Sequence, residues 1–167
     1  ANFIINSAEE ARRMARYNVK YGVDQLKLMA TGGVMSIGDA PGAQDMMYDE
    51  MKAAIDIAKI HGKLTSAHAH GAEGIKAAIR AGITSIEHGM LMDDECIELM
   101  VEHGTYLVPT IIAAYQIVAH GKEMHLPEEN FEKATLCLEK HKEHLMACRA
   151  AGVKIAFGTD AGTPSNF

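Results

Sequence analysis

Five residues of the sequence have side chains that could bind a metal ion or move a proton, and they share one setting. Each lies near or just past the end of a short apolar run, and the set is Lys27, His68, His70, His88 and Asp160. Imidazole nitrogens are common metal ligands, and a carboxylate can bind a cation or accept a proton. His68 and His70 are two residues apart and would point the same way from a strand. The set indicates metal-assisted or acid–base chemistry.

Each of these residues also has a structural interpretation. Lys27 can be a strand-edge lysine that reaches water, the histidine pair can be hydrogen-bonded core residues, and Asp160 can cap a helix. His88 alone is a weak signal. The apolar run around Lys27 favours chemistry, because a bare ammonium buried there would carry a heavy desolvation cost. A lysine whose amine has taken up carbon dioxide is instead an anion with two oxygens, which can bridge two cations.

The elements that must position these residues are marked by glycines. Helical patterns stop just before Gly22, Gly62, Gly82, Gly104 and Gly152, and glycine suits the left-handed position that ends a helix. The five predicted helices cover residues 7–21, 48–61, 72–81, 93–103 and 127–151. The five apolar runs that follow the glycines are too short for helices and predict buried strands at residues 23–29, 63–69, 83–87, 105–108 and 153–157.

Strands that alternate with helices predict βαβ units and a parallel sheet. The carboxyl ends of parallel strands share one edge, so the five candidate residues should meet there, together with Thr110. A doubly wound open sheet is the competing architecture, but no Gly-x-Gly-x-x-Gly turn follows any strand. We expect residues 1–167 to form one domain, a partial (β/α)8 TIM-type barrel of about strands four to eight, because a complete barrel needs about 250 residues.

Composition limits the classes of partner. The formal net charge of −6 and the lack of a basic cluster argue against nucleic acid, and no apolar run approaches the roughly 18 residues of a membrane span. Three scattered cysteines predict buried free thiols and a cytoplasmic location, although export stays open because the sequence does not begin with Met. The six histidines other than His68, His70 and His88 fall in or at the ends of predicted helices, where we expect structural roles.

Four blocks together resemble the amidohydrolase superfamily. They are LKLMATGG (26–33), AHAHGA (67–72), SIEHG (85–89) and GTDAG (158–162). They are most similar to the branch of Xaa-Pro dipeptidases (prolidases), arginine/lysine carboxypeptidases and imidazolonepropionase-related enzymes. The resemblance implies hydrolysis of an amide bond, in a dipeptide or N-acyl amino acid, at a site with two divalent ions, typically zinc, that activate water and polarise the carbonyl.

The same resemblance implies a role for each candidate residue. Lys27 would be the carboxylated lysine that bridges the two Zn²⁺ ions, and His68 and His88 would be ligands of the more exposed ion. Asp160 would be a ligand of the other ion and the general base. His70 stands where similar prolidases carry Tyr and would face the substrate carboxylate.

The sequence departs from the family pattern in one respect, because no His-x-His pair precedes Lys27. We therefore expect the chain to be the C-terminal-side portion of a longer barrel. Two alternatives stay open: a single-metal cyclic-amide hydrolase or deaminase of the imidazolonepropionase type, and a non-catalytic fragment or assembling subunit. The expected partners are a small-molecule or dipeptide substrate and further copies of the chain, since a partial barrel has exposed sheet edges.

Overall fold

The computed structural model shows an α/β fold built on a single parallel sheet, and it describes residues 4–36, 38, 40–123, 125–163 and 166. Five strands are hydrogen-bonded in the order β1-β2-β3-β4-β5, each parallel to its neighbour. The elements in chain order are α1 (Ala8–Lys20), β1 (Gln25–Met29), α2 (Tyr48–Ile60), β2 (Leu64–Gly71), α3 (Ala72–Ala81), β3 (Ser85–Leu91), α4 (Asp94–His103), β4 (Tyr106–Val108), α5 (Ile111–His120), α6 (Glu128–Ala151) and β5 (Lys154–Ile155).

The predicted start of α1 and the predicted helix-ending glycines are confirmed at the level of single residues. The side chain of Ser7 accepts a hydrogen bond from the backbone N–H of Glu10 and caps α1. All five helix-ending glycines have φ between 63° and 96°, a left-handed conformation that costs a residue without a Cβ little. Each strand begins one or two residues after the start of its apolar run. β2 and β3 end later than predicted, at Gly71 and Leu91, and β5 is shorter than predicted because only Lys154 and Ile155 pair with β4.

One helix was absent from the prediction. The helix α5 follows β4 directly, with no intervening glycine, and begins at Thr110, whose backbone is left-handed and whose side chain makes no capping hydrogen bond. Its first turn holds no acidic residue and is rich in β-branched and small apolar residues. Neither a start signal nor a clear amphipathic period marks it, so the described part of the chain has six helices where we expected five.

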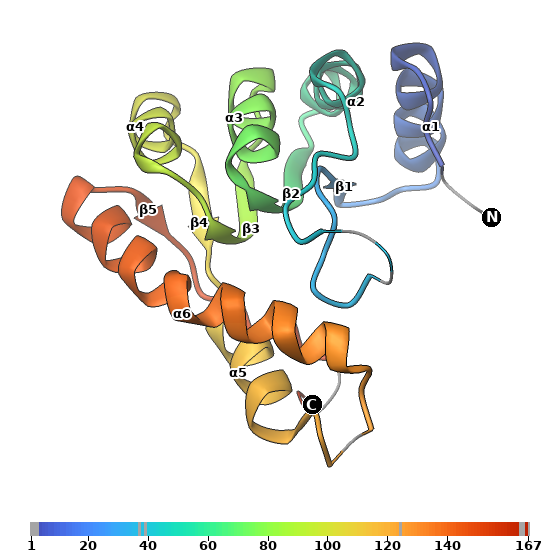
Figure 1. Ribbon diagram of the computed structural model, residues 1–167. Coiled ribbons are helices and arrows are strands. Elements are labelled where there is room, and N and C mark those ends of the chain that lie inside the picture. The colour runs from blue at the N-terminus through green and yellow to red at the C-terminus, as the bar shows by residue number, and fades with distance from the viewer. Residues whose placement is uncertain (1–3, 37, 39, 124, 164–165, 167) are drawn as a thin grey trace.

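The strand order removes the doubly wound alternative. A doubly wound sheet reverses its strand order at a switch point, whereas the five described strands keep chain order throughout. The helices α1, α2, α3 and α4 stand in a row along one side of the sheet (Figure 1). The side chains of β1 alternate between the two faces of the sheet. Leu26 and Leu28 are buried in the main core, whereas Lys27 lies on the exposed face of the strand.

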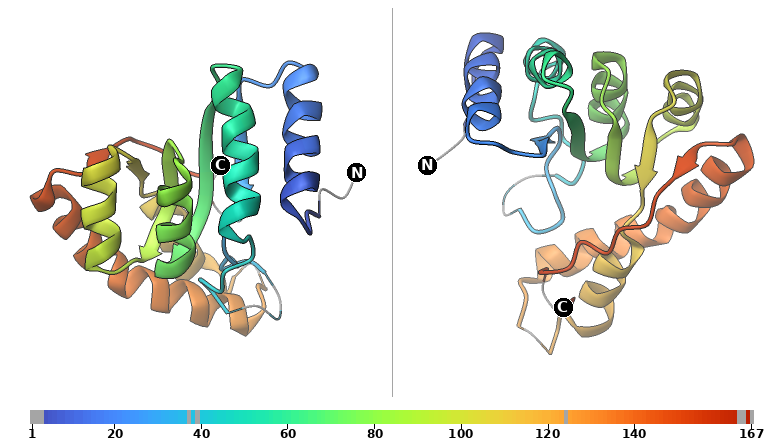
Figure 2. Two further views of the ribbon diagram at one scale, coloured as in Figure 1. Left: turned by 90° about the horizontal axis from the view of Figure 1, so that it is seen from above. Right: turned by 180° about the vertical axis from the view of Figure 1, so that it is seen from behind.

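The helices α5 and α6 pack on each other, and α6 also contacts β3 and α4; Figure 2 shows this arrangement from two further directions. The C-terminal part of α6 contacts α4, and its N-terminal part reaches the loop after β1, where Asn130 donates a hydrogen bond to the Val34 carbonyl. A second apolar cluster lies between this loop, β3, α5 and α6. These two helices therefore close one side of the space at the strand ends.

Two predictions from composition can be compared with the fold. Cys96, Cys137 and Cys148 are buried free thiols, as expected, and burial raises their pKa to about 12, about 11 and about 11 respectively. Within the described residues, no helix is both long enough and apolar enough to cross a membrane.

Candidate functional site

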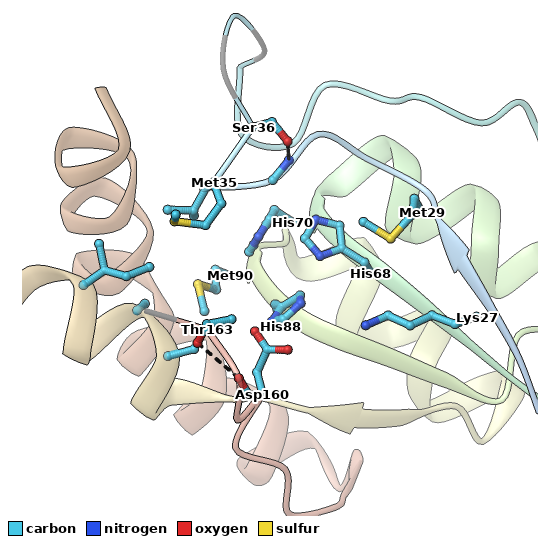
Figure 3. A pocket seen from close by; sticks show the side chains of 15 residues that line it. Lys27, Met29, Met35, Ser36, His68, His70, His88, Met90, Asp160 and Thr163 are labelled. Carbon is cyan, nitrogen blue, oxygen red and sulfur yellow. Dashed lines mark hydrogen bonds between the residues drawn. The ribbon is translucent and has the colours of Figure 1, made fainter. Parts of the chain in front are cut away.

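The five candidate residues line a single open pocket at the carboxyl ends of the strands. Lys27 comes from β1, His68 and His70 from β2, His88 from β3, and Asp160 from the segment after β5. Figure 3 shows their side chains converging from different sides of the pocket. The sheet thus brings together residues that are up to 133 positions apart in the chain (160 − 27). Their chemical roles stay predictions.

The three histidines form a tight group. The ring centroids of His68 and His70 are 4.8 Å apart, those of His68 and His88 are 4.7 Å apart, and those of His70 and His88 are 5.0 Å apart. Among the described residues, neither Nε2 of His68 nor Nδ1 of His70 has a hydrogen-bond partner, although both atoms are buried. A buried polar nitrogen without a partner is costly, so these atoms suit a bound group.

The backbone of His88 turns its side chain into the pocket. By register His88 pairs with Ala69, whose side chain is buried in the main core on the other face of the sheet from that of His68. Simple alternation would therefore point His88 away from His68. Instead His88 has φ 74° and Gly89 has φ 64°, and the register between β2 and β3 shifts just beyond this pair. Such a bulge re-aims a side chain.

All three imidazoles have lowered pKa values. Burial is the largest cause for each ring; the charge of Lys27 adds to it for His68, and neighbouring rings add to it for His70 and His88. The pKa of His70 falls to about 3, and that of His88 falls well below its ordinary value. A neutral imidazole has a free lone pair, so these rings are in the protonation state that binds a cation.

Lys27 differs from expectation in its burial. The apolar run suggested a buried ammonium, but the side chain is exposed, on the face of β1 opposite the buried Leu26 and Leu28. The desolvation argument for its chemistry therefore does not hold in this chain. Its position does hold: the amine points into the pocket toward the histidines (Figure 3).

Asp160 is half-buried and lies beyond the last strand with φ 56°. Its carbonyl oxygen accepts hydrogen bonds from the hydroxyl of Thr163, at 3.1 Å, and from the side-chain amide of Asn166, at 3.1 Å. No helix begins at Asp160 in the described segment up to Asn166, so the helix-cap interpretation is not supported. These contacts use the backbone and leave the carboxylate facing the pocket (Figure 3).

The loop after β1 forms one wall of the pocket. A Cβ on Gly33 would lie 3.1 Å from two ring atoms of His68, so glycine allows the loop to approach the imidazole closely. Lys133 of α6 donates a hydrogen bond to the Ser36 carbonyl at 2.9 Å, next to the bond from Asn130. The rest of this side is apolar and consists of Val34, Met35, Met90, Ala113, Ala114 and Ile117.

Sequence reasoning missed the residues that support His88. Thr110 was counted as a strand-end residue, but its contact with His88 Nδ1, at 2.6 Å, depends on the left-handed backbone of both residues. The structural roles expected for His141 and His144 stay predictions. Their nitrogens lie 2.8 Å from the Pro109 carbonyl and 2.9 Å from the Met90 carbonyl. No local pattern in the sequence marks these contacts between distant segments.

The donor set suits a divalent cation in kind but is incomplete in geometry. Buried neutral imidazoles and a carboxylate are the ligands that zinc prefers. Yet among the residues that the structure describes, no three His, Cys, Asp or Glu side chains are grouped closely enough to hold one ion. A metal ion here would need Lys27, or ligands from elsewhere, in addition to the histidines and Asp160.

The chain is similar over most of its length to a curated protein and to two solved structures. Ochratoxinase from Aspergillus niger is 37% identical over 157 residues, which cover 94% of this chain and 32% of ochratoxinase. The structure of a Xaa-Pro dipeptidase with methionine bound in its active site has a TM-score of 0.90 and 39% identity, covering 97% of this chain and 40% of that one. A prolidase complexed with N-methylphosphonate-L-proline has a TM-score of 0.89 and 35% identity, covering 93% and 38%.

The chain spans about a third of the length of the curated ochratoxinase and about two fifths of the dipeptidase structure. The pattern of the amidohydrolase family, in contrast, matches residues 2–167, which is almost the whole chain. Together with the parallel sheet and the residues gathered at its carboxyl edge, this match shows that the chain belongs to the amidohydrolase family.

Proposed function

We propose that this chain is the C-terminal-side part of a metal-dependent hydrolase that cleaves amide bonds in a dipeptide or an N-acyl amino acid. The observation that carries the proposal is the convergence of three imidazoles, Lys27 and Asp160 on one pocket at the carboxyl ends of consecutive parallel strands. Enzymes built on (β/α)8 barrels place their active sites there. In this proposal β1 to β5 are strands four to eight of such a barrel.

Each residue has a defined task. His68 and His88 present neutral imidazole nitrogens, and Lys27, as a carbamate, adds an anion beside them. Zn²⁺, when bound, would lower the pKa of the attacking water and polarise the scissile carbonyl. Asp160 takes a proton from that water and returns it to the leaving amine. His70, the least exposed of the three histidines, binds the carboxylate end of the substrate.

The apolar wall supports an amino-acid side chain as part of the substrate. Val34, Met35, Met90 and Ile117 offer a surface that an aliphatic or aromatic group could cover, opposite the polar side of the pocket. Two similar structures hold ligands of this kind, since one contains methionine and the other N-methylphosphonate-L-proline. We therefore expect an apolar residue beside the bond that is cleaved.

A substitution at Asp160 tests the catalytic assignment. The zinc-loaded chain should hydrolyse Xaa-Pro dipeptides or N-acyl amino acids, and Asp160→Asn should lower kcat/KM by about 10²–10⁴-fold, the usual contribution of a general base. Asp24→Asn, at an exposed aspartate outside the pocket, is the matched control and should change kcat/KM less than about twofold. Equal activity of Asp160→Asn and the unmodified chain would rule out this role.

The metal count separates the two enzymatic versions. The count is made on a longer chain that completes the barrel, because no His-x-His pair for the second ion precedes Lys27 in this sequence. Two zinc ions for each intact chain support the binuclear site, with loss of one or both in Lys27→Ala. A single tightly bound ion, with full loading of Lys27→Ala, supports the single-metal hydrolase or deaminase instead. Elemental analysis after dialysis against a weak chelator measures the ratio.

A second candidate is a non-catalytic subunit that assembles with other chains. It is favoured by the lack of a three-ligand cluster among the described His, Cys, Asp and Glu residues and by the two free edges of the sheet at β1 and β5. A folded, zinc-loaded chain that hydrolyses none of these substrates supports this candidate.

A further inference from the structure

The contact between His88 and Thr110 is unusual in its backbone. Thr110 Oγ1 lies 2.6 Å from His88 Nδ1, and Thr110 is only 3% exposed. Both residues are left-handed, with φ 45° at Thr110 and φ 74° at His88. A positive φ is unfavourable for a β-branched residue such as threonine and persists only where the surroundings enforce it. The surrounding structure must therefore hold the backbone turn at Thr110 in this conformation.

Two histidines of the helix α6 form hydrogen bonds to the segments on either side of this contact. His141, 1% exposed, places Nε2 2.8 Å from the carbonyl of Pro109, the residue before Thr110. One turn further along α6, His144 places Nδ1 2.9 Å from the carbonyl of Met90, two residues after His88. The same helix face thus binds the chain near the end of β3, at Met90, and just past β4, at Pro109. The gap between these two segments is where the hydroxyl of Thr110 meets the ring of His88.

We propose that Thr110 is a positioning residue for His88 and that His141 positions Thr110. His88 carries its proton on Nδ1 and donates it to Oγ1 of Thr110, so the free lone pair is on Nε2, the nitrogen that faces the pocket. His141 donates from Nε2 to the Pro109 carbonyl and so keeps the Pro109–Thr110 turn in its strained form. The ligand role of His88 rests on the proposed function, but the orientation of its ring does not. A partner that fixes the other ring nitrogen selects both the tautomer and the direction of a ligand imidazole.

The first test needs no metal. In the ¹⁵N-labelled 167-residue chain, long-range ¹H–¹⁵N spectra report the tautomer of each histidine, and His88→Asn identifies the signals of His88. We expect one dominant tautomer of His88 in the unmodified chain and a mixture in Thr110→Val, which keeps the shape of the side chain but lacks the hydroxyl. Thr110→Ser is the matched control and should restore the single tautomer.

The same variants separate this inference from the proposed function. In a zinc competition titration, Thr110→Val should bind about 10–100-fold more weakly than the unmodified chain, and Thr110→Ser within about threefold of it. His141→Phe should behave like Thr110→Val, whereas His141→Gln, which can still donate to a carbonyl, should lie closer to the unmodified chain.

The outcomes are distinct. An unchanged tautomer of His88 in both Thr110→Val and His141→Phe overturns the inference, whatever the zinc affinity. Failure of the unmodified chain to bind zinc contradicts the proposed function, while the tautomer comparison still decides the positioning role. If Thr110→Val does not fold by circular dichroism, the comparison of Thr110→Ser with His141→Phe decides by the same spectra.

Discussion

At the scale of single residues, the pocket depends on backbone segments that approach too closely for any side chain. Gly71 ends β2, and a Cβ there would lie 2.1 Å from the carbonyl oxygen of Gly42, in the loop that carries the pocket wall. The backbone of Gly71 has an ordinary φ of −80°, so only the lack of a side chain explains glycine at this crossing. The loop and β2 touch at this point, and residues 33–36 of the same loop line the pocket.

Replacement of Gly71 by alanine should therefore displace the loop. We expect Gly71→Ala to lower the free energy of unfolding by about 3 kcal/mol, at the upper end for an overpacked site. The amide NMR signals of residues 32–36 should shift as well. The matched control is Gly62→Ala, where φ is 63° but nothing lies within 4 Å of the new Cβ. It should cost about 1–2 kcal/mol from backbone strain alone and leave those signals in place. Unshifted signals in Gly71→Ala would contradict the crossing.

At the scale of elements, α3 and α4 are joined by an ion-pair cluster. Lys76 of α3, 8% exposed, has its amine 2.6 Å from Glu73 and 3.1 Å from both Asp93 and Glu95. The hydrogen bonds that Lys76 donates to Glu73, then to Asp93 and Glu95, raise the pKa of Lys76. Hydrogen bonds from Lys76, then from Arg80, lower the pKa of Glu95. Asp93 also caps α4 by accepting from the N–H of Cys96.

This cluster predicts how stability depends on pH. The pKa of Glu95 is lowered in the folded chain, so its ionised carboxylate stabilises the fold at pH values above the unfolded pKa of about 4.5. This stabilisation is lost as the pH falls through the pKa of the folded chain. Urea unfolding between pH 7 and pH 3 should show that loss. Lys76→Met should be less stable at pH 7 and should lose less stability on acidification. Lys142→Met, on the exposed face of α6, should follow the unmodified chain at every pH.

At the scale of the whole molecule, the sheet ends in exposed apolar surface. β5 is an edge strand, and beside it lies a groove lined by Ile111, Ile112, Tyr115, Ile155 and Phe157. The side chain of Phe157 is 93% exposed. An unpaired strand edge next to an apolar surface favours association with another chain. In the complete barrel of the proposed function, strand one would lie beside β5. For the 167-residue chain by itself, we propose that this groove supports the expected homo-oligomer.

Light scattering across a range of protein concentrations tests self-association. The unmodified chain should show a mass that rises with concentration, and Phe157→Lys should shift it toward the monomer by adding charge to the groove. Ile60→Lys is the control, because Ile60 is 73% exposed at the end of α2 and lies outside the groove. Equal masses for Phe157→Lys and Ile60→Lys at all concentrations would exclude the groove as the interface.

The sequence by itself determined the order and type of most elements and the residues gathered at their ends. Glycine at a helix end and a short apolar run after it are local signals, because they depend on backbone sterics and burial within a few residues. They predicted ten of the eleven described elements and placed Lys27, His68, His70, His88 and Asp160 at one edge.

Only the tertiary structure decided how those residues point and what supports them. The direction of His88 depends on a left-handed backbone and a register shift, and alternation along β3 would give the opposite answer. The contacts of His141 with Pro109 and of Asn130 with Val34 join segments that are far apart in the chain. The exposure of Lys27 depends on which elements cover β1. These features arise from packing between distant segments, which no local spacing of residue types encodes.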